Sequence, residues 1–196
     1  MNQRILTAVV LLTAIVGLLV TGPLCAGEPV VLFDGKTLDN WEVLTCEATV
    51  EDGAILLKSG NGLVQTKKSY DDFVFEYEWK ALNPEKWDSG VYFRYEDVPA
   101  GRPWPSKYQV NLQKGREGDL VGFKDGINSV DLDPHDWNQF ALTVKGTTAA
   151  LKVNGKEAWK VDGIKTPSGL IALQAEVPGG GQFLFRNIRI TELGDE

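Results

Sequence analysis

FVFEYEWK, residues 73–80, is the stretch that decides the fold, because aromatic and charged side chains alternate along it. Successive side chains of a β-strand point to opposite faces. Phe75, Tyr77 and Trp79 therefore face a core. Glu76 and Glu78 face the opposite side. This alternation predicts a half-buried β-strand rather than a helix.

The same alternation recurs along the rest of the chain. It is found in GVYFRYE (90–96), YQVNLQ (108–113), QFALTVK (139–145), GLIALQAE (169–176) and QFLFRNIRIT (182–191). Asn154-Gly155 predicts a hairpin turn, since both positions tolerate a positive φ, and the run 178–181 joins the last two strands. No segment keeps a 3.6-residue apolar period, so helices are at most short. Short strands at intervals of roughly 8–12 residues predict a single all-β domain, an antiparallel β-sandwich or jelly roll.

The alternation separates the side chains into two sets. Those predicted to face the core are Phe73, Phe75, Tyr77, Trp79, Val91, Phe93, Tyr95, Tyr108, Val110, Leu112, Ile171, Leu173 and Ala175. Those predicted to face outward are Glu76, Glu78, Lys80, Tyr92, Arg94, Glu96, Gln109, Asn111, Gln113, Gln174 and Glu176. If these strands are neighbours in one sheet, the outward set forms rows of carboxylates, amides and aromatic rings on one face.

This outward face has two interpretations. Any antiparallel sandwich has a solvated face, so the rows are consistent with plain surface. Planar amides, a lone arginine and aromatic rings are also the groups that hydrogen-bond to sugars and stack on them. Trp87 and Trp104 lie in loops without a core period, and an exposed indole favours a ligand platform. The predicted partner is therefore a carbohydrate. Its predicted contacts are Tyr92, Gln109, Asn111, Gln113, Gln174, Trp87 and Trp104.

The composition excludes several kinds of site. One histidine, His135, cannot supply the imidazoles of a catalytic zinc site, and two cysteines cannot form a zinc finger. A net charge of −7 argues against nucleic acid as a partner. A serine triad would need His135, which stands in a turn, and no serine has the context of a nucleophile elbow. Asp34, Asp39, Asp131 and Asp133 could hold a structural Ca²⁺ or another divalent metal, although no ligand spacing requires one.

Residues 1–26 have the order of a secretory signal peptide. Arg4 precedes an apolar stretch from Ile5 to Val20, which is followed by a break and a small residue at Ala26. The stretch is short for a membrane span of roughly 20 residues, so cleavage is favoured over an anchor. Lipidation at Cys25 is disfavoured, because Pro23-Leu24 fits the lipidation motif badly. The mature domain, residues 27–196, is expected to be secreted or periplasmic, with one cysteine, no internal disulfide and no stable membrane span.

The chain carries VLFDGKTLDNW (31–41), SGVYFR (89–94), DWN (136–138) and FRNIRI (185–190) in this order. These motifs resemble the bacterial 3-keto-disaccharide hydrolase family. The resemblance covers residues 30–193. It implies a concanavalin A-like, laminarinase-like β-sandwich.

The resemblance also implies an enzyme that acts on glycosides oxidised at C3. A ketone there acidifies the C2 proton, so cleavage can proceed by proton abstraction and β-elimination, followed by hydration. Such a site needs a general base, a donor or cation for the enolate oxygen, and an acid for the leaving group. Arg94, in the SGVYFR motif, is carried over for binding or oxyanion stabilisation. Glu176 or Glu78 is the predicted base.

The sequence departs from the family pattern at two positions. Members usually have Tyr-Glu where this chain has Tyr108-Gln109, and many have a histidine where it has Ala175-Glu176. Gln109 cannot act as a base. A non-catalytic carbohydrate-binding module of the same fold, with aromatic rings stacked on sugars, therefore remains an alternative. A weaker alternative is a conventional retaining glycosidase that uses Glu76 and Glu78.

Overall fold

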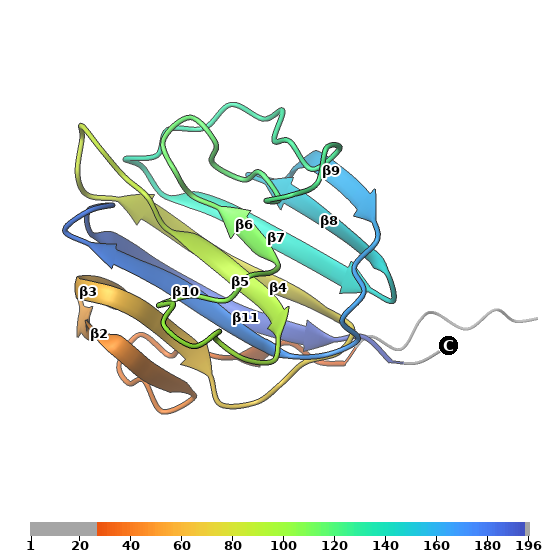
Figure 1. The fold of residues 1–196 in the computed structure, drawn as a ribbon, viewed down its shortest axis with the longest axis horizontal. Helices are drawn as coiled ribbons and strands as arrows, with labels where there is room; N and C mark the ends of the chain where they lie inside the picture. The colour runs from red at the N-terminus through yellow and green to blue at the C-terminus, as the bar shows by residue number, and fades with distance from the viewer. Residues whose placement is uncertain (1–26, 195–196) are drawn as a thin grey trace, which may run out of the picture.

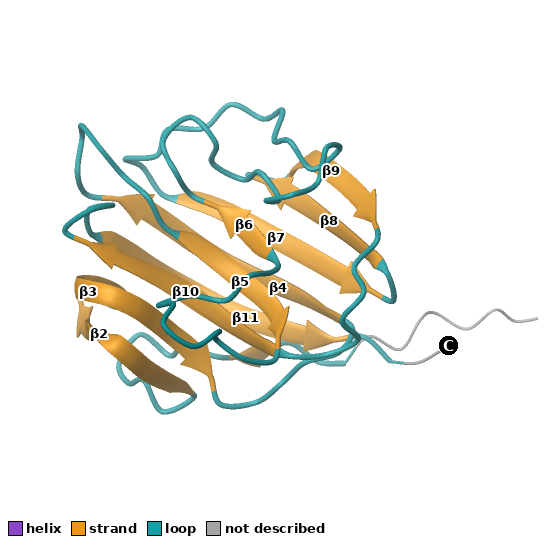
Figure 2. Ribbon diagram, in the orientation of Figure 1, coloured by secondary structure: helices purple, strands orange, loops and turns teal. Residues whose placement is uncertain are grey.

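The computed structural model describes residues 27–194, so the predicted leader lies outside the described residues. Within this range Figure 2 shows strands and loops, and no helix that could cross a membrane. The strands are β1 (Val30–Val31), β2 (Trp41–Glu51), β3 (Ala54–Thr66), β4 (Phe73–Ala81), β5 (Gly90–Tyr95), β6 (Gln109–Asn111), β7 (Asn138–Lys145), β8 (Thr148–Val153), β9 (Lys156–Asp162), β10 (Leu170–Val177) and β11 (Phe183–Glu192).

The strands form one curled antiparallel sheet that folds over on itself (Figure 1). Its order is β6-β5-β10-β3-β11-β4-β7-β8-β9, with β2 paired to β3 and β1 to β11. The long strand β3 connects the two layers, because residues 55–57 pair with β11 whereas residues 60–65 pair with β10. The first layer contains β6, β5 and β10, and the second contains β11, β4, β7, β8 and β9. The predicted all-β sandwich is confirmed.

The core lies between the two layers, and β4 contributes its largest side chains. Phe73, Phe75, Tyr77 and Trp79 are at most 1% exposed, while the residues between them are only partly buried. Burying a large apolar side chain contributes about 1.5–3 kcal/mol, so the alternation of β4 alone is a substantial part of the fold's stability. The alternation predicted for this strand is confirmed.

The predicted hairpin at Asn154-Gly155 is also present. Val153 pairs with Lys156 across a two-residue loop, and the loop residues have φ values of 50° and 78°. A left-handed conformation at both positions favours asparagine followed by glycine. The turn therefore sets the register of β8 and β9.

One expectation about the sheet is wrong. Strands β10, β3 and β11 separate β5 from β4, so the two strands belong to different layers. Glu76 and Glu78 consequently face outward from the second layer, whereas Tyr92, Gln109 and Gln174 face outward from the first. The predicted single polar face is two faces on opposite sides of the molecule.

A second correction concerns the end of β5. Leu170 pairs with Tyr95 but Ala172 pairs with Tyr92, so β5 carries one extra residue, and Arg94 has a φ of 46°. Such a bulge shifts the alternation by one position. Arg94 is therefore buried, at 1% exposure, instead of facing outward. Tyr95 leaves the main core and joins a small second apolar cluster on the outer face, formed by Leu63, Tyr92, Tyr95 and Ala172.

Candidate functional site

A row of hydrogen-bonded amides lies on the outer face of the first layer. The Gln109 Nε2 of β6 donates to Gln174 Oε1 of β10 at 2.6 Å, and Gln174 Nε2 donates to Glu176 Oε2 at 3.2 Å. Gln174 is only 3% exposed, so its carboxamide is fixed by its neighbours. We call Gln109, Gln174 and Glu176 the amide row.

Two glycines provide the space that the site requires. A Cβ at Gly90 would lie 2.3 Å from Gln109 Nε2, so a side chain there would displace the amide row. A Cβ at Gly180 would lie 2.1 Å from the Asp88 carbonyl oxygen. The loop after β10 therefore packs directly against Asp88, two residues before β5, and Gly180 links the backbones of Asp88 and Glu176.

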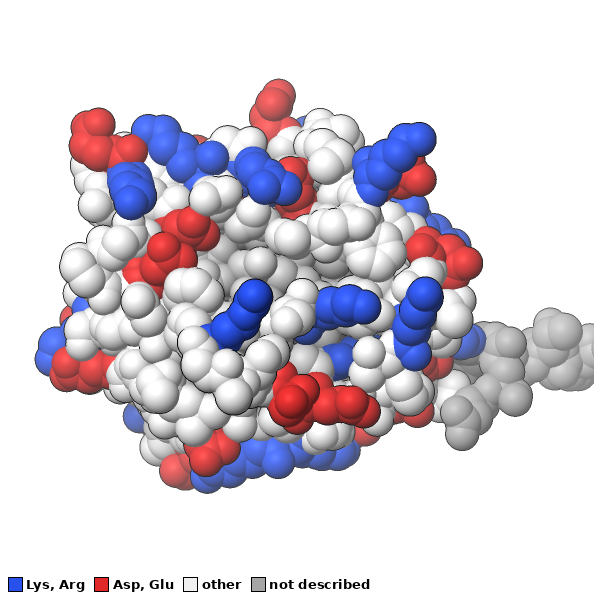
Figure 3. Space-filling view, in the orientation of Figure 1, with Lys and Arg blue, Asp and Glu red and all other residues white. Residues whose placement is uncertain are grey.

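Asp88 and Glu176 form a pair of carboxyl groups with altered acidity. Partial burial is the main cause that raises the pKa of Asp88. Burial also raises the pKa of Glu176, and the charge of Asp88 adds to this effect. Burial, Asp88 and Glu176 together raise the pKa of the Tyr92 hydroxyl, so it remains a proton donor. In Figure 3 acidic side chains lie at the left of this face, with basic side chains nearby and a shallow hollow of uncharged residues to their right.

Replacing Asp88 with asparagine is expected to stabilise the protein at neutral pH. The raised pKa means that the folded state binds more protons than the unfolded state just above pH 3.8, so the ionised carboxyl destabilises the fold as pH rises. We expect the melting temperature of Asp88→Asn to exceed that of wild type by about 1–3 °C at pH 7, with the difference vanishing near pH 3. Thermal unfolding followed by circular dichroism at the two pH values measures this.

The matched control for this prediction is Asp97→Asn, which removes an exposed carboxylate from the loop after β5. Its melting temperature should follow that of wild type at both pH values. An Asp88→Asn variant that is less stable than wild type at pH 7 would contradict the destabilising role of the Asp88 charge.

Three other predicted binding residues lie near the amide row. Gln113 Nε2 donates to Asp88 Oδ2 at 2.7 Å, which connects the carboxyl pair to the segment after β6. Asn111 is 5% exposed and its Oδ1 accepts the backbone amide of Gln113 at 3.0 Å, so it shapes that turn. The indole of Trp104 donates to the Ala175 carbonyl at 3.1 Å and packs against the second apolar cluster. Trp104 therefore lies at the edge of the site.

Trp87 does not form the exposed platform that its loop position indicates. It is 7% exposed, belongs to the main core and donates to Glu117 Oε1 at 2.7 Å. The ring of His135 meets it edge-on at 4.8 Å between centroids. The single histidine and this tryptophan therefore stabilise the loops and do not extend the amide row.

The bulge at the end of β5 directs the Arg94 side chain away from the amide row. Its Nε donates to the Asp71 carbonyl at 2.8 Å, its Nη1 to the Gly146 carbonyl at 2.6 Å, and its Nη2 to Asp72 Oδ1 at 2.6 Å. The side chain is fully buried. This geometry gives Arg94 a structural role, so the oxyanion donor must be sought elsewhere.

Glu78 lies in the second layer and does not approach Glu176. Arg186 Nε donates to Glu78 Oε2 at 2.7 Å, and Arg189 Nε donates to Glu76 Oε2 at 2.7 Å. A retaining glycosidase needs one carboxyl group that is free to protonate the leaving group. Both carboxylates are occupied in ion pairs, which disfavours the conventional glycosidase.

The sequence interpretation missed Asp88. Residues 88, 90 and 92 follow the period of two along β5, so Asp88 shares the outward face with Tyr92. Extending the alternation by two positions before Gly90 is the signal that could have found it.

The described residues contain no cluster of three or more His, Cys, Asp or Glu side chains arranged to hold a metal. Asp34, one of the aspartates considered for Ca²⁺, instead accepts the backbone amides of Lys36 and Thr37, each at 2.8 Å. These hydrogen bonds lower the pKa of Asp34 and hold the loop after β1.

Over residues 28–191 the chain matches the family described as the 3-keto-alpha-glucoside-1,2-lyase-like domain. The chain belongs to this family. It is therefore a carbohydrate-active domain of the group that the sequence motifs indicate. No curated protein sequence matches the chain significantly.

Several solved structures share the fold. A "putative glycosyl hydrolase" from Parabacteroides distasonis has a TM-score of 0.68 at 20% identity, covering 85% of this chain and 94% of that one. The carbohydrate-binding module CBM66 from Bacillus subtilis has a TM-score of 0.60 at 14% identity, covering 76% of this chain and 93% of that one. A Bacillus subtilis protein with a galectin-like fold has a TM-score of 0.60 at 8% identity, covering 87% and 97%. At these identities the likeness concerns the fold alone.

Proposed function

We propose that the protein cleaves 3-keto-glycosides by elimination and hydration at the amide row. The observation that carries this proposal is Glu176 beside Asp88, because burial and the charge of Asp88 raise the pKa of Glu176 and make its carboxylate a stronger base. Elimination needs a base and then an acid, and one carboxyl group with a raised pKa can serve as both in turn. Family membership supports the substrate class.

In the proposed reaction, ionised Glu176 takes the proton from C2 of the 3-keto sugar. The electron pair of the C–H bond forms an enolate with the C3 ketone, and its collapse forms the C1–C2 double bond and breaks the bond from C1 to the leaving oxygen. The Glu176 carboxyl, now protonated, delivers the proton to that oxygen, and ionised Asp88 keeps the pKa of Glu176 raised. Water then adds across the double bond to give the free 3-keto sugar, so the net reaction is hydrolysis.

The enolate oxygen needs a hydrogen-bond donor, and Tyr92 meets this requirement. Its hydroxyl is close enough to Asp88 and Glu176 for their charges to raise its pKa. A neutral phenol in a partly buried site stabilises a developing oxyanion without carrying a charge of its own. Tyr92 therefore replaces Arg94 in the role that the family resemblance indicates.

The amide row would hold the substrate. Gln109 has a second N–H group and Gln174 a second lone pair beyond their mutual bond, so both can reach sugar hydroxyls. The Trp104 ring at the edge of the row would contact the leaving group. We place the reaction outside the cytoplasm on the basis of the leader predicted at residues 1–26.

A second candidate function is non-catalytic sugar binding. The observation that favours it is the identity of residue 109, because Gln109 stands where the family resemblance leads us to expect a glutamate. Its amide donates a hydrogen bond to Gln174 within the amide row. A site with an amide at this position keeps its hydrogen-bonding capacity but loses one ionisable group.

A substrate assay separates the two functions. The mature protein is incubated with p-nitrophenyl 3-keto-β-glucoside, with the 3-keto-α-glucoside, and with the two unoxidised glucosides. Release of nitrophenol from a 3-keto substrate alone is the expected result. Release from neither 3-keto anomer, together with saturable binding of a glucoside, would establish the binding module and overturn the catalytic proposal.

A further inference from the structure

We propose that the outer face of the second layer carries a separate binding site for a neutral oligosaccharide. The site is a cavity of about 560 Å³ between strands β4, β7 and β11 and the segment around β1. Ligand sites commonly have volumes of about 300–1,000 Å³. This site is independent of the amide row, so the proposal does not rest on catalysis there.

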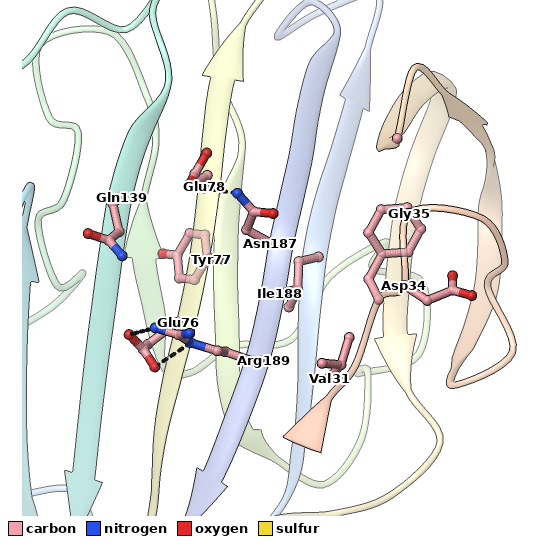
Figure 4. A pocket seen from close by; sticks show the side chains of 12 residues that line it. Val31, Asp34, Gly35, Glu76, Tyr77, Glu78, Gln139, Asn187, Ile188 and Arg189 are labelled. Carbon is pink, nitrogen blue, oxygen red and sulfur yellow. Dashed lines mark hydrogen bonds and ion pairs between the residues drawn. The ribbon is translucent and has the colours of Figure 1, made fainter. Parts of the chain in front are cut away.

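The cavity has a wall of polar side chains, and the segment around β1 lies opposite that wall. Figure 4 shows Glu76 and Glu78 on β4, Gln139 on β7, and Asn187 and Arg189 on β11 side by side along one wall. Across from them lies the segment of Val31, Asp34 and Gly35. Val31 is 59% exposed, so its side chain offers apolar surface to a ligand beside the Asp34 carboxylate. A pyranose ring has hydroxyl edges and C–H faces, so its hydroxyls can meet the polar wall while a C–H face contacts Val31.

The charges of the polar wall are neutralised in pairs. Arg189 donates to both oxygens of Glu76, at 2.7 and 2.8 Å. Arg186 and Asn187 donate to the two oxygens of Glu78, each at 2.7 Å. A free anion or cation would have to compete with these pairs. A neutral polyhydroxyl ligand can instead use the remaining carboxylate lone pairs and guanidinium N–H groups without breaking them.

The polar groups are also held in place before any ligand arrives. Asn187 occupies the bulge where β11 shifts register against β4, with a φ of 51°, and this conformation directs its amide to Glu78. The guanidinium of Arg186 stacks on Trp137 at 3.9 Å from the ring centroid. Fixed side chains reduce the entropy lost on binding. A residue other than glycine in the left-handed region is uncommon, and such conformations are concentrated at functional sites.

One side-chain amide of the polar wall is free to bind a ligand. The exposed Gln139 carboxamide has no hydrogen-bond partner among residues 27–194, whereas its backbone amide donates to Asn154 Oδ1 at 2.8 Å. A free carboxamide beside ion-paired groups offers two N–H donors and a carbonyl oxygen acceptor to the same hydroxyl network. Gln139 is therefore the residue that a sugar would engage with least rearrangement.

NMR titration of the ¹⁵N-labelled protein tests the proposal. The probes are cellotriose, laminaritriose and maltotriose, and the signals are the side-chain N–H groups of Gln139, Asn187 and Arg189. Saturable shifts of these signals with at least one trisaccharide support the site. Shifts confined to Gln109 and Gln174, or none with any probe, overturn it. Inorganic phosphate is titrated in parallel, and a phosphate shift at Arg189 without a sugar shift also overturns it.

Variants separate binding from folding. Asn187→Gly removes the amide but suits the positive φ, and Gln139→Ala removes the free carboxamide, so both should fold. Each should weaken trisaccharide binding by about 3–10-fold, the usual effect of one lost hydrogen bond. Thr143→Ala, on the same strand as Gln139 but outside the cavity, should bind like wild type. Unchanged affinity in both test variants would contradict the proposed contacts.

Discussion

Replacing Arg94 with alanine is expected to destabilise the protein by about 3–5 kcal/mol, the usual cost of breaking a buried ion pair. The guanidinium joins three segments at one end of the sandwich: the residues before β4, the turn between β7 and β8, and the loop before β10. It reaches them through Asp72, Gly146 and Thr166, respectively. Alanine leaves these acceptors without their buried donor. Total stability is typically about 5–15 kcal/mol, so the loss is a large part of it.

Urea unfolding of two further variants controls this prediction. Arg94→Lys keeps the charge but cannot form the planar fork, so we expect a loss between those of wild type and alanine. Asp71→Asn alters only a carboxylate that is 3.6 Å from the guanidinium and 70% exposed, and its effect should stay below about 1 kcal/mol. Should Arg94→Ala unfold at the wild-type urea concentration but lose activity, Arg94 would have a functional role that its buried position does not show.

The parts of the fold that depend on neighbouring residues were predictable from the sequence. The alternation in β4 and the Asn154-Gly155 turn are local features, because side-chain direction repeats every two residues and a two-residue hairpin needs left-handed residues. Each is present in the structure. The same local reasoning places Tyr92, Gln109 and Gln174 on one face. In the structure Gln109 donates a hydrogen bond directly to Gln174.

The parts that depend on distant contacts were not predictable in this way. Assigning β4 and β5 to different layers requires the pairing of β3 with both β10 and β11, which no local pattern indicates. The bulge at Arg94 reverses the alternation by one residue, and its reason is the set of acceptors contributed by loops far along the chain. Trp87 lies in a loop without core periodicity, yet Glu117 and His135 enclose it.

Replacing Glu176 with glutamine is expected to reduce kcat/KM for a 3-keto-glucoside by about 10²–10⁴-fold, the usual contribution of a general base. Glutamine has the same shape and can still bond to Gln174, but it cannot accept the C2 proton. The raised pKa of Glu176 also sets the pH dependence. The base must be ionised, so wild-type kcat/KM should increase as pH rises through that pKa, and this rising limb should disappear in the variant. Initial rates from pH 4 to 8 measure both effects.

Glu42→Gln is the matched control, because Glu42 on β2 accepts a hydrogen bond from Gln65 on β3 and not from the residues of the carboxyl pair. Its rate should stay within about twofold of wild type. Asp88→Asn provides an independent readout, since removal of the neighbouring charge lowers the pKa of Glu176 and should move the rising limb to lower pH. A wild-type rate in folded Glu176→Gln would exclude Glu176 as the base. A rising limb that stays in place in Asp88→Asn would show that the two carboxyl groups do not act together, even if each is needed for turnover.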